Sequence, residues 1–178
     1  MENKKYELLD NDTVTTWDGH ALKRIRALVA IGSLVAAGEL GGYIESEDNL
    51  SQVYGDAWVS GDAQVYGDAR VSGNAQVSGN AWVSGNAQVY GDAWVYGDAR
   101  VEQRRDIFWL SIIGSENGTY TAFKNKDGGV SVNRGCFNGT LEQFSDAVNE
   151  RHAGQYHQEY QLVIELTKIR LGVIEEAV

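Results

Sequence analysis

The chain has 178 residues with 21 glycines, no proline, one cysteine and a formal net charge of -10. Its length allows one large or two small domains, and a 43% hydrophobic share with 22% charged residues excludes a disordered chain. The single cysteine excludes an internal disulfide, and the acidic balance disfavours general binding to nucleic acid or to an anionic membrane.

Residues 1–50 are predicted to form an N-terminal β cap. The start, MENKKYELLDNDTV, lacks the apolar run of a signal peptide, and no stretch of the chain is apolar enough to span a membrane, so we expect a cytoplasmic protein. Asp18-Gly19 lies between two segments of strand character and predicts a hairpin. Lys23, Arg24 and Arg26 form a dense basic group, for which a solvated strand face is the preferred explanation and an anionic ligand the alternative.

Residues 51–101 carry a repeat of six residues, V-[YS]-G-[DN]-A-x, with nine valines in register from Val53 to Val101. This period fits neither an amphipathic helix nor strand alternation, but it is typical of a parallel β-helix. Valine suits a short strand and points inward, and glycine with Asp or Asn accepts positive φ at the turn. A disordered low-complexity linker is the disfavoured alternative. Because Val53 follows Leu50 after only three residues, we expect an irregular first coil.

The repeat resembles the left-handed β-helix of hexapeptide-repeat proteins. That resemblance implies the handedness, a triangular coil made of three hexads, and a trimer with the prisms side by side. So short a prism needs caps at its open ends.

The residues flanking each valine are predicted to face outward, and they include seven aromatic side chains. One explanation is a subunit interface, or packing under the terminal segments. The other is a binding surface on which the rings stack on a planar ligand or a partner chain. Both explanations are compatible with a cleft between subunits. The seven are Tyr54, Trp58, Tyr66, Trp82, Tyr90, Trp94 and Tyr96.

The repeat lacks the residues that hexapeptide-repeat enzymes use. Acyltransferases of this fold have a histidine in or beside the coils as general base, and their carbonic-anhydrase relatives bind zinc through histidines. His20, His152 and His157 all lie outside the repeat. We therefore expect no catalytic residue, no metal and no cofactor.

Residues 102–178 are predicted to form an α+β cap with a β-hairpin and two helices. IFWLSIIG, TYTAFKN and VSVNRG have strand character, and the capping-box pattern Thr140-Leu141-Glu142-Gln143 predicts the start of a helix that Gly154 can end. A second helix is predicted from about Tyr156 to Leu171. Its predicted inward residues are Tyr156, Tyr160, Val163, Ile164, Thr167 and Leu171.

Cys136 and His152 raise the hypothesis of a nucleophile and its base. The preferred explanation is a small buried cysteine and a histidine at a helix end, where the helix dipole favours a cation.

Several segments together resemble hexapeptide-repeat proteins of bacteriophages and prophages, which are often described as polymer-forming cytoskeletal proteins. They are RIRAL, GELGGYIESEDNLS, VYGDAWVSGDAQV, GCFNGTLEQFSDAVNERHAG and EYQLVIEL. The resemblance implies a phage-encoded protein in the cytoplasm of a bacterial host and carries over no catalytic residue. The non-repetitive flanks should block end-to-end growth of the prism.

We predict a noncatalytic, trimeric binding protein that counteracts a host defence, either by sequestering a small nucleotide-type signal or by occupying a host protein surface. The alternatives are a structural or assembly module and a hexapeptide-type acyltransferase, which the missing histidine disfavours. Aromatic stacking combined with guanidinium groups suits planar ligands that carry phosphate. The candidate contacts are Tyr54, Trp58, Tyr66, Arg70, Trp82, Tyr90, Trp94, Tyr96, Arg100, Arg104 and Arg105.

Overall fold

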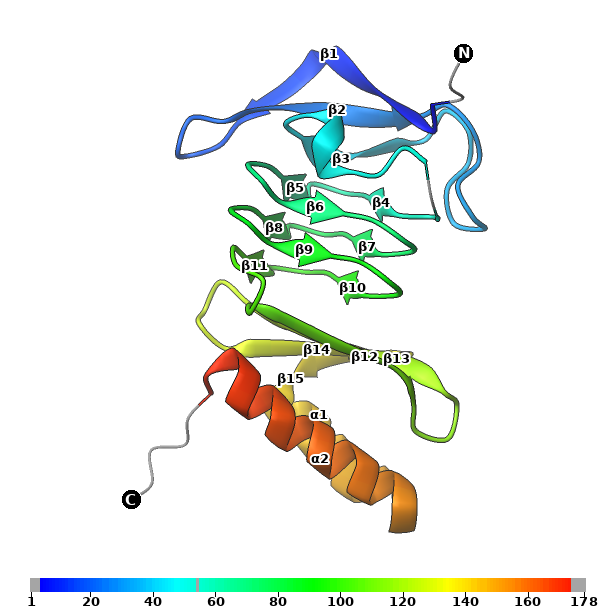
Figure 1. The fold of residues 1–178 in the computed structure, drawn as a ribbon, viewed down its shortest axis with the longest axis vertical. Coiled ribbons are helices and arrows are strands. Elements are labelled where there is room, and N and C mark those ends of the chain that lie inside the picture. Colours follow the sequence, from blue (N-terminus) through cyan, green and yellow to red (C-terminus); the bar gives the residue numbers. More distant parts are fainter. Residues whose placement is uncertain (1–3, 54, 174–178) are drawn as a thin grey trace.

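The computed structural model describes residues 4–53 and 55–173, and it is mainly β, as predicted. Figure 1 shows an elongated molecule in which an N-terminal hairpin, a stack of short strands and a C-terminal sheet with two helices follow one another along the long axis. No helix in the part of the chain that the structure describes is long and apolar enough to cross a membrane.

The N-terminal cap extends one wall of the stack. Strands β1 (Tyr6–Thr15) and β2 (Ala21–Ala27) form the predicted hairpin, and β3 (Leu40–Ile44) pairs with β2 on the other side. Strand β3 then runs parallel to β5 of the stack, which gives a six-stranded sheet in the order β1-β2-β3-β5-β8-β11. A short 3-10 helix, η1 (Glu47–Asn49), follows β3. The cap therefore continues the backbone hydrogen bonding of the coils.

The repeat folds into a parallel β-solenoid. Each strand pairs with the strand eighteen residues further along the chain, as Trp58 pairs with Gln76 and Gln76 with Trp94. The repeat alanines and the valines from Val59 to Val101 are buried in a continuous core. The two-residue strands are β4 (Trp58–Val59), β5 (Gln64–Val65), β6 (Arg70–Val71), β7 (Gln76–Val77), β8 (Trp82–Val83), β9 (Gln88–Val89), β10 (Trp94–Val95) and β11 (Arg100–Val101).

The first valine of the repeat does not point inward, and that prediction was wrong. Val53 is 68% exposed, whereas Leu50 is fully buried and forms a parallel bridge with Val71. Because Leu50 already fills the interior at this position of the coil, the next valine of the core is Val59, nine residues later instead of six. The expected irregularity of the first coil is therefore an insertion that contains Val53.

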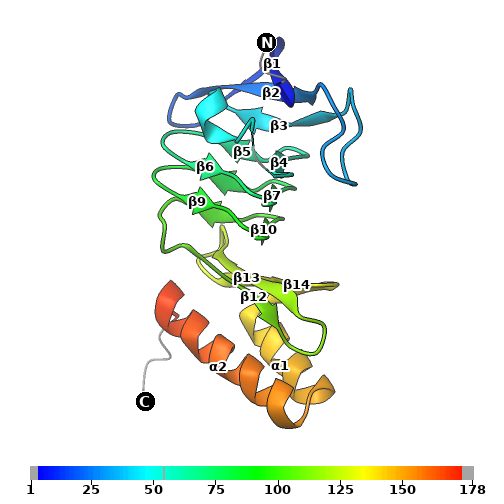
Figure 2. The same ribbon diagram turned by 45° about the vertical axis from the view of Figure 1, so that its right-hand side comes forward.

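The C-terminal sheet closes the other end of the solenoid. Its four antiparallel strands run in chain order: β12 (Ile107–Ile113), β13 (Gly118–Lys124), β14 (Val130–Arg134) and β15 (Phe137–Thr140), of which β15 was not predicted. Ile107 and Phe123 belong to the core of the solenoid, while Tyr120 belongs to a separate core under the helices. Figure 2 shows the sheet between the solenoid and the two helices.

Helices α1 (Leu141–Arg151) and α2 (Gly154–Leu171) cover the outer face of this sheet. Helix α1 begins at the predicted capping box, in which the Thr140 hydroxyl accepts a hydrogen bond from the Gln143 backbone N–H. Gly154 begins α2 instead of ending α1, because α1 already stops at Arg151. The inward residues of α2 are buried as predicted, except Tyr156, which is exposed.

Candidate functional site

The aromatic residues predicted to face outward differ according to the end of the solenoid at which they lie. Trp58 and Tyr66 are buried, which corrects the expectation that they face solvent. Trp58 packs edge-on against Tyr6 of β1 with the ring centroids 6.4 Å apart, and Tyr66 lies against His20 with a centroid distance of 5.0 Å. The N-terminal cap covers both rings, so they hold the cap on the solenoid.

The basic group of the N-terminal hairpin is also engaged. Lys23 pairs with Asp10 at 2.7 Å and Arg24 with Asp12 at 2.8 Å, and Arg26 pairs with Glu7. These acidic partners lie on β1, the strand that pairs with β2; Glu7 is directly opposite Arg26, and Asp10 and Asp12 lie in the irregular part of the pairing between Leu8 and Thr13. The cations therefore stabilise the pairing of β1 and β2 and are not free to receive a ligand anion.

Three further candidate residues, Trp82, Tyr96 and Arg100, make contacts within the chain. The guanidinium of Arg100 lies over the Trp82 ring, 4.0 Å from its centroid, and donates hydrogen bonds to two backbone carbonyls of the solenoid. Tyr96 is half-buried against Phe123 of the C-terminal sheet, with ring centroids 5.6 Å apart. Arg105 and Arg70 are exposed, and Tyr54 lies outside the described residues.

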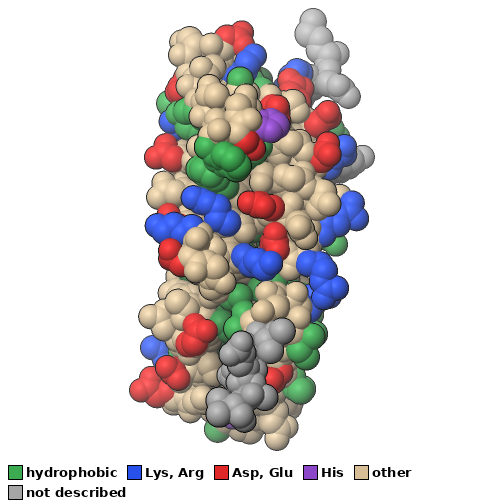
Figure 3. Space-filling view, turned by 90° about the vertical axis from the view of Figure 1, so that its left-hand side faces the viewer, with side chains coloured by type: hydrophobic (Ala, Val, Ile, Leu, Met, Phe, Trp, Pro, Cys, Tyr) green, Lys and Arg blue, Asp and Glu red, His purple; other side chains and the backbone are tan. Residues whose placement is uncertain are grey.

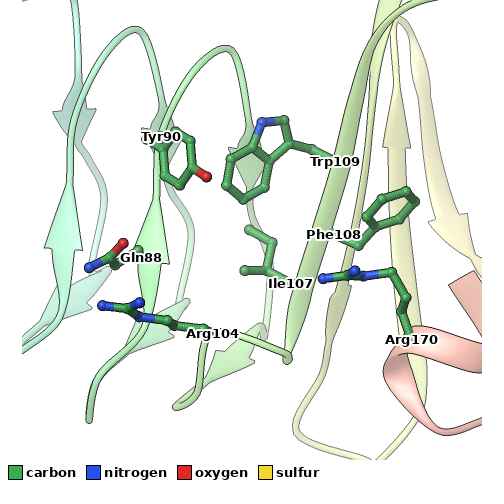
Figure 4. A pocket seen from close by; sticks show the side chains of 7 residues that line it. All are labelled: Gln88, Tyr90, Arg104, Ile107, Phe108, Trp109 and Arg170. Atoms are coloured by element: carbon green, nitrogen blue, oxygen red, sulfur yellow. The ribbon is translucent and has the colours of Figure 1, made fainter.

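Two of the remaining candidates, Tyr90 and Arg104, line a cavity of about 450 Å³ where the solenoid meets the C-terminal cap (Figure 4), whereas Trp94 lies outside it. We call it the junction cavity. The β6–β9 wall of the solenoid, the connection into β12, β12 itself and the final turn of α2 all contribute to it. Its lining residues are Gln88, Tyr90, Arg104, Ile107, Phe108, Trp109 and Arg170.

Ring contacts fix the aromatic side chains of the junction cavity. Tyr90 and Trp109 meet edge to face with their centroids 4.4 Å apart, and Trp109 also packs against the core of the solenoid. The Arg170 guanidinium lies 5.3 Å from the centroid of the Phe108 ring. In Figure 4, Arg104 lies beside Gln88 on the solenoid side, and Arg170 reaches in from α2 on the opposite side. The cavity is therefore rimmed by cations on two sides and walled by rings.

The two arginines of the junction cavity have no anionic partner within the described residues. Among residues 4–53 and 55–173, no carboxylate oxygen lies within 4.0 Å of the side-chain nitrogens of Arg104 or Arg170. The backbone N–H of Arg104 donates to the Asn86 side chain at 3.3 Å, which fixes the chain at this point. Arg70 adjoins the cavity through the pairing of β6 with β9, where its strand partner is Gln88. On the face turned to the viewer in Figure 3, Lys and Arg side chains gather over the middle of the molecule, with acidic side chains between them.

Sequence reasoning found Tyr90 and Arg104 but missed Phe108, Trp109 and Arg170. Phe108 and Trp109 occur in a segment that was assigned only as a strand, and Arg170 lies on the exposed side of a helix far away in sequence. Nothing in the repeat pattern indicates that the end of α2 reaches β12. The available signal was the aromatic pair Phe108-Trp109, which is separated from Arg104-Arg105 by only two residues, because aromatic and cationic residues then mix just after the end of the repeat.

The prediction that Cys136 is buried was wrong. Cys136 is a free, exposed thiol, because the turn between β14 and β15 carries it to the surface. His152 lies at the C-terminal end of α1, as expected, and its backbone N–H donates to the Val148 carbonyl. Both residues line a second cavity, separate from the junction cavity. Within residues 4–53 and 55–173, no group of three or more His, Cys, Asp or Glu side chains is arranged to hold a metal.

Comparison with protein families identifies the solenoid. A family model described as the YdcK β-solenoid repeat matches residues 51–66, 63–76, 75–91 and 87–103. The matched units end before Arg104, so the similarity covers the solenoid and leaves both caps outside it. A comparison with curated proteins finds no match to the chain. The repeat is therefore a β-solenoid repeat, and the caps are additional to it.

Proposed function

We propose that the chain is a noncatalytic binding protein whose junction cavity takes a small, planar anion of the nucleotide type. One observation carries the proposal: two guanidinium groups, for which the described part of the chain provides no carboxylate partner, line one cavity together with three aromatic rings. In a chain of net charge -10, cations that are left unpaired next to aromatic rings favour an anionic ligand at that place.

The side chains around the cavity suit the two halves of a nucleotide. Guanidinium groups bind phosphate oxygens through charge-assisted and often bidentate hydrogen bonds. The rings of Tyr90, Phe108 and Trp109 are of the kind that stack on nucleobases, and the Gln88 amide has both a donor and an acceptor for a base edge. The cavity of about 450 Å³ lies within the usual range of small-ligand sites, roughly 300–1,000 Å³.

The overall charge favours a small ligand over a nucleic acid chain. A protein of net charge -10 repels an extended polyanion, whereas a local cationic cavity still attracts a compact one. Sequestration of a nucleotide signal, as part of a phage's counteraction of a host defence, is the biological role that we propose for such binding.

Isothermal titration with a panel of linear and cyclic nucleotides, and with the matching nucleosides as uncharged controls, tests the proposal. We expect at least one nucleotide to bind and its nucleoside to bind more weakly. Replacing Arg104 or Arg170 by Met should weaken binding about tenfold or more each, since a hydrogen bond to a charged group contributes about 1.5–3 kcal/mol.

Arg105→Met is the matched control for these variants. Arg105 is the sequence neighbour of Arg104 and is exposed, but it does not line the cavity. This variant removes the same charge and should bind like the wild type. Equal weakening in all three variants would indicate general charge attraction, and absence of binding across the whole panel would remove the proposal.

A second candidate function is self-association into the homotrimer, and the exposed Trp94 favours it. Trp94 is 45% exposed on the β4-β7-β10 wall, and it lines two hollows, one of which includes Leu34, a 63% exposed residue. Apolar surface of this kind is typical of interface cores. Light scattering coupled to size exclusion should give the mass of a trimer, and Trp94→Glu should give a monomer. A monomeric wild type at all concentrations would exclude this assembly.

A further inference from the structure

The second cavity lies within the C-terminal cap and shares no lining residue with the junction cavity. It has a volume of about 230 Å³ and lies between the β12–β13 connection, the turn from β14 to β15, and the facing ends of α1 and α2. Arg134 of β14 is its central charged group, while Arg151 and His152 approach from the end of α1. We call it the cap cavity.

Arg134 is a buried cation with poor neutralisation. Its side chain is only 8% exposed, and its nearest carboxylate is Glu116, whose oxygen lies 3.8 Å from Nη1 and whose side chain is 81% exposed. Nη2 donates a hydrogen bond to the Ile113 carbonyl at 2.9 Å, but the buried Nε has no hydrogen-bond partner. A buried charge without a close counterion and a buried donor without an acceptor both cost free energy.

The position of Arg134 is fixed by its surroundings. A Cβ atom on Gly118 would lie 2.5 Å from Nη1, so this glycine leaves the space that the guanidinium fills. The Tyr160 ring lies on another side, with its centroid 5.9 Å from the guanidinium carbon. Relaxation of Arg134 toward solvent therefore requires the loss of these contacts, and an anion that enters the cavity is the simpler way to neutralise it.

The cap cavity also has apolar lining residues, beside polar ones that include Ser115 and Glu116. The apolar residues are Phe137, Phe144, Ala147 and Val148, and Phe144 packs edge-on against both Phe137 and Tyr160. A ligand that matches this lining has a compact anionic head and a short apolar body. A carboxylate suits the head, because its two oxygens match the planar donors of a guanidinium.

We propose that the cap cavity binds a small monocarboxylate with an aromatic or short aliphatic body, its carboxylate at Arg134 and its body against Phe137 and Phe144. The volume of about 230 Å³ is below the range of roughly 300–1,000 Å³ for drug-sized ligands, which limits the ligand to a small acid. This site is independent of the nucleotide site that we propose at the junction cavity.

Cys136 supplies a direct reporter for occupancy. It is the one cysteine of the chain, it is exposed, and it lines the cap cavity, so alkylation by iodoacetamide modifies a single known place. The full chain is alkylated during a titration with phenylacetate, with phenylacetamide as the uncharged match and inorganic phosphate as an anion without an apolar body. We expect phenylacetate to slow alkylation in a saturable way, and we expect the other two compounds to leave the rate unchanged.

Two variants test whether the protection of Cys136 by phenylacetate depends on Arg134. Arg134→Met should weaken phenylacetate protection about tenfold or more, since it removes hydrogen bonds to a charged group. Glu116→Gln should strengthen protection, because it removes a competing carboxylate that is largely exposed and so leaves the fold intact. If Arg134→Met does not fold, the comparison of phenylacetate protection in the wild type and in Glu116→Gln still tests the proposal. Equal protection by phenylacetate and phenylacetamide, no protection by either, or weaker protection in Glu116→Gln would each overturn the proposal.

Discussion

The two ends of the solenoid are capped in different ways. At the N-terminal end, β3 joins the parallel ladder through β5, and the hairpin buries Trp58 and Tyr66 completely or nearly so. At the C-terminal end, an antiparallel sheet crosses the solenoid and bridges to it at Ala99 and Asn125. The continuous ladder closes one end, whereas the crossing sheet leaves the junction cavity at the other.

The electrostatic contrast follows the same division. The hairpin cations Lys23, Arg24 and Arg26 each have an acidic partner, but Arg104 and Arg170 have none within the described residues. Equivalent residue types at the two ends of the solenoid therefore have different roles. A ring or cation under the N-terminal cap stabilises the fold, and the same type at the C-terminal junction remains accessible to a ligand.

Trp58 and Trp94 test this contrast most strongly, because they occupy the same strand position on one wall of the solenoid. Trp58→Ala should lower the free energy of unfolding by about 3–5 kcal/mol, the usual cost of removing a buried large aromatic side chain. Trp94→Ala should lower it by about 1 kcal/mol or less, since Trp94 is 45% exposed. Urea unfolding of both variants measures the difference. Similar losses of unfolding free energy in the two variants would contradict the conclusion that the N-terminal end is closed by its cap and the C-terminal end is open.

Two turn glycines at the same corner of successive coils, Gly79 and Gly97, provide a second comparison between the interior and the C-terminal end of the solenoid. Gly79 and Gly97 both have positive φ, of +72° and +65°, so alanine at either position is strained by about 1–2 kcal/mol. A Cβ at Gly79 would also lie 2.8 Å from the Gly97 nitrogen, whereas a Cβ at Gly97 meets nothing within 4 Å. Gly79→Ala should therefore have the lower thermal midpoint of the two. An equal or reversed order would show that the C-terminal coil is not open at this corner.

The pairing of His20 with Glu45 predicts a pH dependence of the N-terminal cap. A hydrogen bond to Glu45 raises the pKa of His20 above its ordinary 6.5, and the same bond lowers the pKa of Glu45 below its ordinary 4.5. The His20 contribution is complete below pH 6.5 and is lost as the pH rises through the raised pKa. The Glu45 contribution is complete above pH 4.5 and is lost as the pH falls through the lowered pKa.

The stability difference between the wild type and His20→Asn should therefore be largest between pH 4.5 and pH 6.5 and decline on both sides. We expect a small effect, because both side chains are partly exposed. Urea unfolding over a pH series measures this difference. Glu45→Gln should lose the same stability contribution over the same pH range. A difference that grows as the pH rises above His20's ordinary value would contradict the pairing.

The sequence predicted the parts of the fold that depend on local pattern. The hexad valines, the hairpin at Asp18-Gly19 and the capping box at Thr140 are set by side chains close in the chain, and the structure confirms them. The prediction from sequence failed where two side chains could fill the same interior position, since Leu50 is buried there and Val53 is exposed. Burial of Trp58 by β1 and the approach of Arg170 to β12 depend on how the caps dock, which no periodicity encodes. Of the residues that line the junction cavity, the sequence therefore predicted only Tyr90 and Arg104 as contacts.

Photo-cross-linking with an azido-adenine nucleotide, followed by peptide mapping, tests the central claim that the C-terminal junction is the open, anion-binding end. The account predicts labelled peptides that contain Tyr90, Phe108 to Trp109 or Arg170, with labelling suppressed by the unmodified nucleotide. Two results would contradict this conclusion. One is labelling that the unmodified nucleotide suppresses but that is confined to the N-terminal hairpin, and the other is labelling that the unmodified nucleotide does not suppress.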